Sequence, residues 1–180
     1  MESQIIAQAI GIVAMFFNIF SYQQKSAKGV IAFQLFGGLF FSVNFLMIGA
    51  YSGGLLNLVA VIRALLFLKK EKFHTDRWYW LIAFTLVYLV SYVMTFTVFS
   101  KELTVLSAIM EFLPVIGMVA TTLAFRHSEA KVIRRFGFAS SGCWLIYNIY
   151  AFSVGAIICE AFSIISIIIG ILRLDKKTDP

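Results

Sequence analysis

Residues 144–173, WLIYNIYAFSVGAIICEAFSIISIIIGILR, decide the class of fold. The segment is almost entirely apolar, and a membrane-spanning helix needs only about 20 such residues. It nevertheless contains Asn148 and Glu160. An ionisable side chain at the centre of a membrane helix costs roughly 2.5–3.5 kcal/mol on insertion scales. We therefore consider these two residues candidates for a functional polar site.

A shorter segment, residues 40–63 (FFSVNFLMIGAYSGGLLNLVAVIR), has the same character. Asn44, Asn57 and Arg63 interrupt its apolar sequence in comparable places. Two related segments that both accept this cost predict one polar site shared by two halves of the molecule.

The composition is that of a membrane protein. The chain has 180 residues, of which 61% are hydrophobic and 13% charged, and its mean hydropathy is +0.90. Soluble domains carry about 25% charged residues. The net charge of +6 comes from basic residues in short loops between apolar runs, so it indicates orientation in the membrane rather than binding to nucleic acid. Cys143 and Cys159 lie in apolar segments and suggest no disulfide or metal spacing.

Seven segments are long enough to span or nearly span a bilayer. A cleavable signal peptide has basic residues before its apolar segment. The first span has none before it, so we expect it to remain as a helix. Turns are predicted at 49–54, which holds Gly53–Gly54, and at 153–155. The predicted spans cover residues 5–22, 30–47, 55–68, 78–100, 106–125, 136–152, and a last segment ending near residue 174.

Loop charges test this count of spans. With seven spans, thirteen Lys and Arg residues fall on one side of the membrane, Lys101 alone falls on the other, and Arg63 stays inside the third span. A miscounted span would move every later loop to the opposite side. The positive-inside rule therefore predicts an outer N-terminus and a cytoplasmic C-terminus.

The two halves of the chain resemble each other. Gly38 and Gly142 lie 104 positions apart (142 − 38 = 104), and so do Asn44 and Asn148 (148 − 44 = 104). We therefore predict a single transmembrane domain, residues 1–180, in a 3+1+3 plan. Residues 5–70 form the first three-helix repeat, 78–100 a linker helix and 106–174 the second repeat. Because the linker is a single helix, both repeats have the same orientation in the membrane, as parallel repeats do.

Residues 21–30, SYQQKSAKGV, resemble the signature of PQ-loop and SWEET-type transporters, in which a Pro-Gln pair precedes a Lys-Ser-x-x-Gly turn. Gln23 and Gln24 stand where that pair is expected and are candidate gating residues. Residues 111–117 (EFLPVIG) and 143–155 (CWLIYNIYAFSVG), leading to Glu160, resemble the YgjV-like bacterial inner-membrane proteins. This likeness extends over essentially the whole chain. It implies a SWEET-like all-α bundle in the cytoplasmic membrane and names no substrate.

The chain differs from the SWEET pattern in two respects. SWEET transporters have prolines in the first two helices of each unit, thought to act as hinges, whereas this chain has only Pro114 and Pro180. A proline-hinged rocking motion is therefore in doubt. SWEET pockets are also lined by an asparagine on the third helix of each unit. Asn57 matches that place in the first half and Glu160 in the second, so the implied pocket is asymmetric and carries a negative charge.

Each candidate residue also has a structural interpretation. Glu160 is either a solute ligand or proton-coupling carboxylate, or a carboxylate stabilised by a helix N-terminus. Arg63 either binds an anionic group or pairs with Glu160 or Glu111. Asn44 and Asn148 either face a cavity or bond neighbouring helices.

Trp144 precedes Asn148 by one helical turn and shares its face, so it either stacks on a solute ring or packs in the core. Glu111 and Pro114 are interpreted most simply as the start of a helix with proline near the first turn, and otherwise as a gate.

The sequence thus predicts a transporter or facilitator of a small polar solute, such as a sugar or a vitamin-like nucleoside, by alternating access. The expected partners are the lipid bilayer, the solute and a second copy of the chain, without nucleic acid, cofactor or metal. No Ser/His/Asp constellation or phosphate-binding glycine loop indicates an enzyme. The alternative is a non-transporting adaptor whose basic loops, 69–77 and 126–135, bind anionic lipid or a cytoplasmic partner. A sealed bundle with a Glu160–Arg63 ion pair would favour that alternative. The predicted pocket residues are Asn57, Glu160, Asn44, Asn148, Arg63 and Trp144.

Overall fold

The computed structural model describes residues 2–47, 51–150 and 154–175, which form helices and connecting loops and no strand. Seven helices are long, and between α3 and α5 lies the short α4 (Lys70–Phe73). A π-helical turn, η1 (Ile171–Asp175), continues the last helix. The long helices are α1 (Glu2–Ser21), α2 (Ala27–Met47), α3 (Tyr51–Leu68), α5 (Trp78–Thr97), α6 (Val105–Phe125), α7 (Ala130–Tyr150) and α8 (Val154–Gly170).

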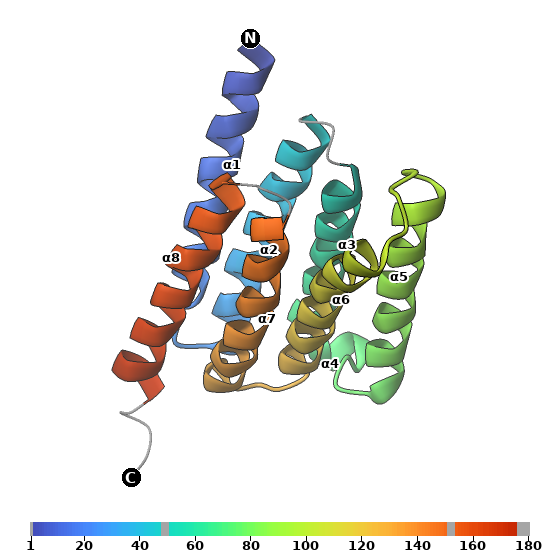
Figure 1. Cartoon of the computed structure of the whole chain (residues 1–180). Coiled ribbons are helices and arrows are strands. Elements are labelled where there is room, and N and C mark those ends of the chain that lie inside the picture. The colour runs from blue at the N-terminus through green and yellow to red at the C-terminus, as the bar shows by residue number, and fades with distance from the viewer. Residues whose placement is uncertain (1, 48–50, 151–153, 176–180) are drawn as a thin grey trace.

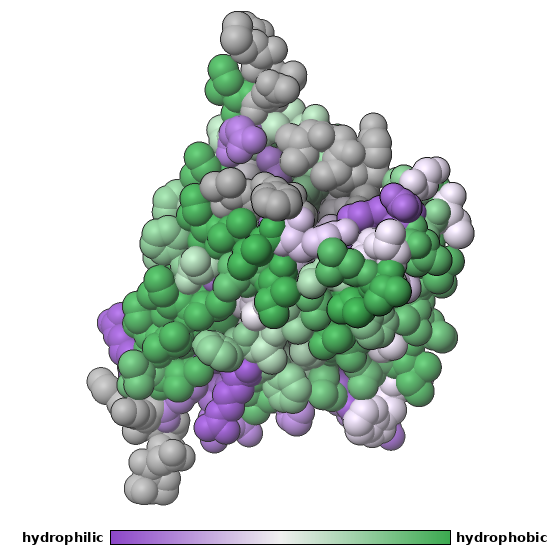
Figure 2. Space-filling model, viewed as in Figure 1, coloured by the Kyte–Doolittle hydropathy of each residue, from purple (hydrophilic) through white to green (hydrophobic). Residues whose placement is uncertain are grey.

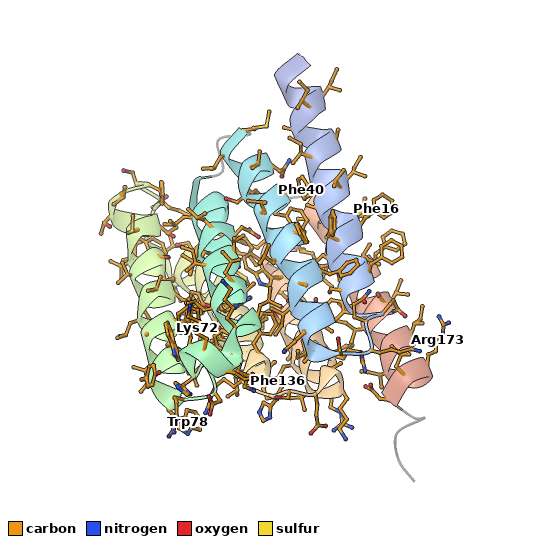
Figure 3. All side chains as sticks on the ribbon, turned by 180° about the vertical axis from the view of Figure 1, so that it is seen from behind. Phe16, Phe40, Lys72, Trp78, Phe136 and Arg173 are labelled. Carbon is orange, nitrogen blue, oxygen red and sulfur yellow. The ribbon has the colours of Figure 1, made fainter. Side chains whose placement is uncertain are left out.

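Consecutive long helices run in opposite directions, so their loops alternate between the two ends of the bundle (Figure 1). One end holds the loops 22–26, 69–77 and 126–129 together with the last turn of the described chain. We call it the basic end, because it gathers the basic loop residues other than Lys101. Figure 3 shows Trp78 and Arg173 toward this end, with Phe16 and Phe40 along the length of the bundle. Lys176 and Lys177 lie outside the described residues.

The helices pack as two groups of three. In the first group α2 contacts both α1 and α3, and in the second α7 contacts both α6 and α8. The groups meet where α1 contacts α8, α2 contacts α7 and α3 contacts α6. Helix α5 packs on α6 and α3, at the side of the bundle.

The face of the bundle seen in Figure 2 is largely apolar along the helices. On α5, the large side chains Ile82, Leu86, Val90 and Val93 follow one another at helical spacing, and more than half of each is exposed. Such a continuous exposed apolar face is destabilising in water and suits contact with lipid. The fold is therefore that of a helical membrane protein.

Within the described residues, length and composition alone identify four helices that can cross a membrane: Ala27–Met47, Trp78–Thr97, Val105–Phe125 and Gly155–Asp175. Two shorter apolar helices, Ile5–Ser21 and Gly53–Leu68, accompany them. Helix α7 is less apolar, because Lys131, Arg134 and Arg135 lie within its first turns.

Two predicted boundaries were wrong. Gly53 and Gly54 belong to α3 rather than to a turn; Gly49 of that predicted turn lies outside the described residues. A Cβ at Gly53 would lie 3.3 Å from the Phe45 ring, so the absence of a side chain lets α3 approach α2 closely. Helix α7 begins at Ala130, six residues before the predicted 136. The prediction assigned Arg134 to a loop because it is charged, whereas an ion pair that the sequence alone did not reveal lets it be buried in the helix. Residues 151–153, where a turn was expected, are also outside the described ones.

Candidate functional site: a polar cavity between two helix groups

A cavity of about 130 Å³ lies between the two groups of three helices. Its walls come from α1, α2 and α3 on one side and from α6, α7 and α8 on the other, whereas no described residue of α5 lines it. A single water needs about 10–15 Å³ of such volume. The cavity can therefore hold several waters or one small polar molecule.

Five of the six predicted pocket residues line this cavity: Asn57 and Arg63 from α3, Trp144 and Asn148 from α7, and Glu160 from α8. The structure thus brings together residues up to 103 positions apart in the chain (160 − 57 = 103). Whether they bind a solute stays a prediction.

Asn44 is the exception. Its Nδ2 donates a hydrogen bond to the Ala7 carbonyl at 2.7 Å, which ties α2 to α1 within the first group. It is buried in that contact and is not among the lining residues. Of the two roles considered for Asn44, the structure shows the bond between neighbouring helices.

The lining residues reveal a register that the sequence comparison missed. Twelve of them form six pairs whose members are 103 positions apart. The helices α2 and α7 share this offset at their starts (130 − 27 = 103) and at their ends (150 − 47 = 103). The six pairs are Asn18 and Thr121, Tyr22 and Phe125, Gly38 and Ser141, Phe41 and Trp144, Phe45 and Asn148, and Asn57 and Glu160.

This offset explains the different environments of Asn44 and Asn148. The predicted match between them has an offset of 104, one residue away from the register of the helices. One residue turns a helix by about 100°, so the two asparagines face different directions. In the register of 103, Asn148 corresponds to Phe45, which also lines the cavity.

Arg63 is a buried cation held by neutral groups. Arg63 is only 4% exposed. Nη1 donates to the Tyr88 hydroxyl at 3.2 Å and to the Met118 carbonyl and Thr122 Oγ1 at 3.1 Å each. The guanidinium carbon lies 4.9 Å from the centre of the Phe125 ring, a cation–π contact. Its Nε has no hydrogen-bond partner among the described residues.

Glu160 lies across the cavity, on α8. Ser141 of α7 and Tyr22 line the same cavity. The Oε2 atom is buried and has no hydrogen-bond partner among the described residues. No ion pair joins Glu160 to Arg63 in the described part of the chain.

Two other charged side chains buried in the described helices are paired. Glu111, on α6, forms an ion pair with Lys101 from the α5–α6 loop, so the predicted pairing of Arg63 with Glu111 was wrong. The Lys101 ammonium also lies 5.1 Å from the centre of the Tyr150 ring. This contact explains why one lysine lies at the end of the bundle opposite the basic end. Arg134 of α7 pairs with Asp175 of η1 at the basic end.

Two of the three candidate gating residues lie where the helix groups meet at the basic end. Gln23 donates from Nε2 to the Ser166 carbonyl at 2.6 Å and to its hydroxyl at 2.9 Å, linking the α1–α2 loop to α8. The carbonyl of Gln24 accepts from Arg134 Nη1 at 2.9 Å. Pro114 is the tenth residue of α6 and is buried, so its predicted place near the first turn was wrong.

A second, larger pocket of about 680 Å³ opens at the basic end, with Lys28, Lys70 and His127 among its lining residues. Partial burial lowers the pKa of the Lys70 ammonium, which donates to the Arg126 carbonyl. Phe125 lines both this pocket and the central cavity, and is only 1% exposed. Phe125 is therefore a residue that the two spaces share.

These observations define a helical membrane protein with an apolar exterior and a polar cavity inside. The family model Imp-YgjV, described as bacterial inner membrane protein, matches residues 5–178. The chain belongs to this family and is a multi-pass protein of the bacterial inner membrane. No curated protein and no solved structure matches it.

Proposed function

We propose that this protein is a transporter or facilitator of a small polar solute that works by alternating access around the central cavity. The observation that carries the proposal is the cavity itself, which two groups of three helices line with Asn57, Asn148, Arg63 and Glu160. A packed structural bundle would fill this space with apolar side chains. Polar groups facing a cavity inside a membrane protein are typical of a solute pathway.

The proposal includes a seven-span, 3+1+3 arrangement of parallel repeats, as in the SWEET and PQ-loop group. Six pairs of lining residues at one offset of 103 support two related repeats around a shared site. The lateral position of α5, between the groups in sequence, supports its role as the linker. In parallel-repeat transporters the substrate site lies at the interface of the repeats.

The proposed orientation places the basic end in the cytoplasm and the N-terminus outside. Its support is the concentration of the loop Lys and Arg residues at one end of the bundle. The opposite end has Lys101, which is engaged by Glu111.

Alternating access needs the contacts at one end of the cavity to break while those at the other end form. At the basic end, Gln23 links the α1–α2 loop to α8 through Ser166, and Phe125 lines both the cavity and the larger pocket. Movement of the second helix group away from the first would break the Gln23 hydrogen bonds. It would also join the cavity to the larger pocket beyond Phe125, opening a path to the cytoplasm.

The structure gives less support to the adaptor alternative. That alternative expects a sealed bundle with Glu160 and Arg63 joined in an ion pair. The described residues instead enclose a cavity, and both side chains face it without pairing.

Proteoliposomes containing the purified full chain test the proposal. After an osmotic shock with glycerol, glucose or glycine, stopped-flow light scattering measures solute entry. Entry of at least one of these solutes should exceed that of empty liposomes, and Glu160→Gln should reduce it. Glu102→Gln makes the same chemical change at an exposed loop position and should leave the rate unchanged. Rates equal to those of empty liposomes for every solute would refute the proposal.

A further inference from the structure

The charged side chains in the interior of the described bundle separate into two kinds. Glu111 and Arg134 are buried and each has an ion-pair partner, Lys101 and Asp175 respectively. Arg63 and Glu160 have none, and both line the central cavity. The unpaired charges of opposite sign are therefore collected in one place.

The hydrogen bonds show the same separation. Among the described residues, four buried side-chain polar atoms lack a partner, and two of them are Arg63 Nε and Glu160 Oε2. A buried ion without a counter-charge destabilises the fold. A ligand that donates to the carboxylate and accepts from the guanidinium would compensate both groups at once.

The spacing of the two groups limits the length of that ligand. Glu160 corresponds to Asn57 in the register of 103, so the two residues belong to equivalent levels of their helices. Arg63 lies six residues further along α3, or about 9 Å toward the basic end at 1.5 Å per residue. A ligand that reaches both groups must carry its two charged ends within a cavity of about 130 Å³, which limits it to a small molecule.

We infer that the cavity binds a small zwitterion, with its carboxylate on Arg63 and its ammonium group on Glu160. The inference rests on the proposed function and names the substrate class of that site. Three hydrogen bonds hold Arg63 Nη1 in place, so the guanidinium is preorganised beside the cavity. Phe41 and Trp144, a pair in the register of 103, provide an apolar wall for the ligand's carbon atoms.

Other solute classes match these groups less well. A neutral sugar would leave both charges without a counter-ion. An anion would compensate Arg63 and leave Glu160, whereas a cation would do the reverse. A charged group excluded from water and left unpaired weakens binding strongly. A short amino acid satisfies both.

Isothermal titration of the purified full chain in lipid nanodiscs tests the inference. The probes are glycine, L-alanine and L-serine, with propionate, ethylamine and glucose as matched compounds lacking one or both charges. At least one amino acid should bind ten-fold or more tightly than all three matched compounds, a difference of about 1.4 kcal/mol. Glu160→Gln should reduce this preference over propionate to less than three-fold, and Glu102→Gln should preserve it.

The outcomes separate this inference from the proposed function. Binding of glucose or propionate as tightly as any amino acid would overturn the zwitterion inference, and so would an absence of amino-acid binding. If proteoliposomes still admit glycerol or glucose, transport itself stands. If no solute enters above the rate of empty liposomes, the proposed function fails as well.

Discussion

Arg63 shows how a cation can be buried in a membrane helix without a carboxylate beside it. Three neutral oxygens accept from a single nitrogen, and an aromatic ring covers one face. Two of these acceptors, on Tyr88 and Thr122, are themselves 2.9 Å apart, so they form one network between α5 and α6. The arrangement fixes the guanidinium of a residue that lines the cavity.

Replacing Tyr88 by Phe should destabilise this network. The change removes one acceptor from a buried charged donor, and we expect the free energy of unfolding to fall by about 1–3 kcal/mol. Tyr79→Phe is the matched control, because the Tyr79 hydroxyl bonds an exposed backbone carbonyl at 3.3 Å; it should change stability by less than about 0.5 kcal/mol. Reversible denaturation in detergent micelles measures both, and equal effects would contradict the role given to Tyr88.

The Lys101–Glu111 pair gives a second prediction for single residues. Lys101→Ala leaves the Glu111 carboxylate buried without a cation, which should cost about 2 kcal/mol, less than for a fully buried pair because Lys101 is partly exposed. Adding Glu111→Gln should recover part of the loss, since the uncompensated charge is then gone. A double-mutant cycle measures the coupling, and additive losses would show that the pair is not energetically linked.

The sequence predicted individual residues unevenly. Asn57, Asn148, Arg63 and Glu160 could be found because polar residues in apolar helices are conspicuous. Tyr22 and Phe125 could not, because an aromatic side chain in a bundle is usually core, and nothing local marks these two as cavity-lining. The partner of Glu111 was missed because it comes from a loop, whose backbone path no periodicity predicts.

At the scale of helices, close approach decides which contacts form. A Cβ at Gly170, the last residue of α8, would lie 2.6 Å from the Tyr22 carbonyl oxygen and 2.8 Å from Arg134 Cδ. A carbonyl oxygen of the main chain cannot move aside as a flexible side chain can. Glycine at this position therefore lets α8 contact the α1–α2 loop, next to the hydrogen bonds of Gln23.

Gly170→Ala should therefore weaken the packing of α8 at the basic end. We expect a loss of about 1–3 kcal/mol in stability, the usual consequence of overpacking. Gly142→Ala is the control, because a Cβ there meets nothing within 4 Å; it should be neutral or stabilising by up to about 1 kcal/mol, since alanine favours helix. Thermal unfolding in detergent compares the two, and a stable Gly170→Ala variant would refute the close contact.

Helix positions followed from hydropathy, but helix boundaries did not. The start of α7 was placed too late because Lys131, Arg134 and Arg135 look like loop residues. Hydropathy cannot register that Arg134 is compensated by Asp175, forty-one positions away. The same limit explains α4, a single short helix within a charged loop.

For the whole molecule, the important feature is that the cavity lies between two units rather than inside one. A proposed transport cycle must therefore change the contacts between the units while each unit keeps its own. The Gln23–Ser166 contact joins the units, whereas the Asn44–Ala7 contact lies within the first unit. These two contacts distinguish a rocking mechanism from a rigid pore.

Disulfides at the two contacts provide the test. In a background with Cys143 and Cys159 replaced by Ala, oxidised Gln23→Cys/Ser166→Cys should hold the basic end closed and reduce solute entry to the rate of empty liposomes. Reduction with dithiothreitol should restore it. The pair Ala7→Cys/Asn44→Cys joins α1 to α2 inside one unit, so its oxidation should leave entry unchanged. Full solute entry through the oxidised Gln23→Cys/Ser166→Cys variant would mean that the units need not separate at the basic end.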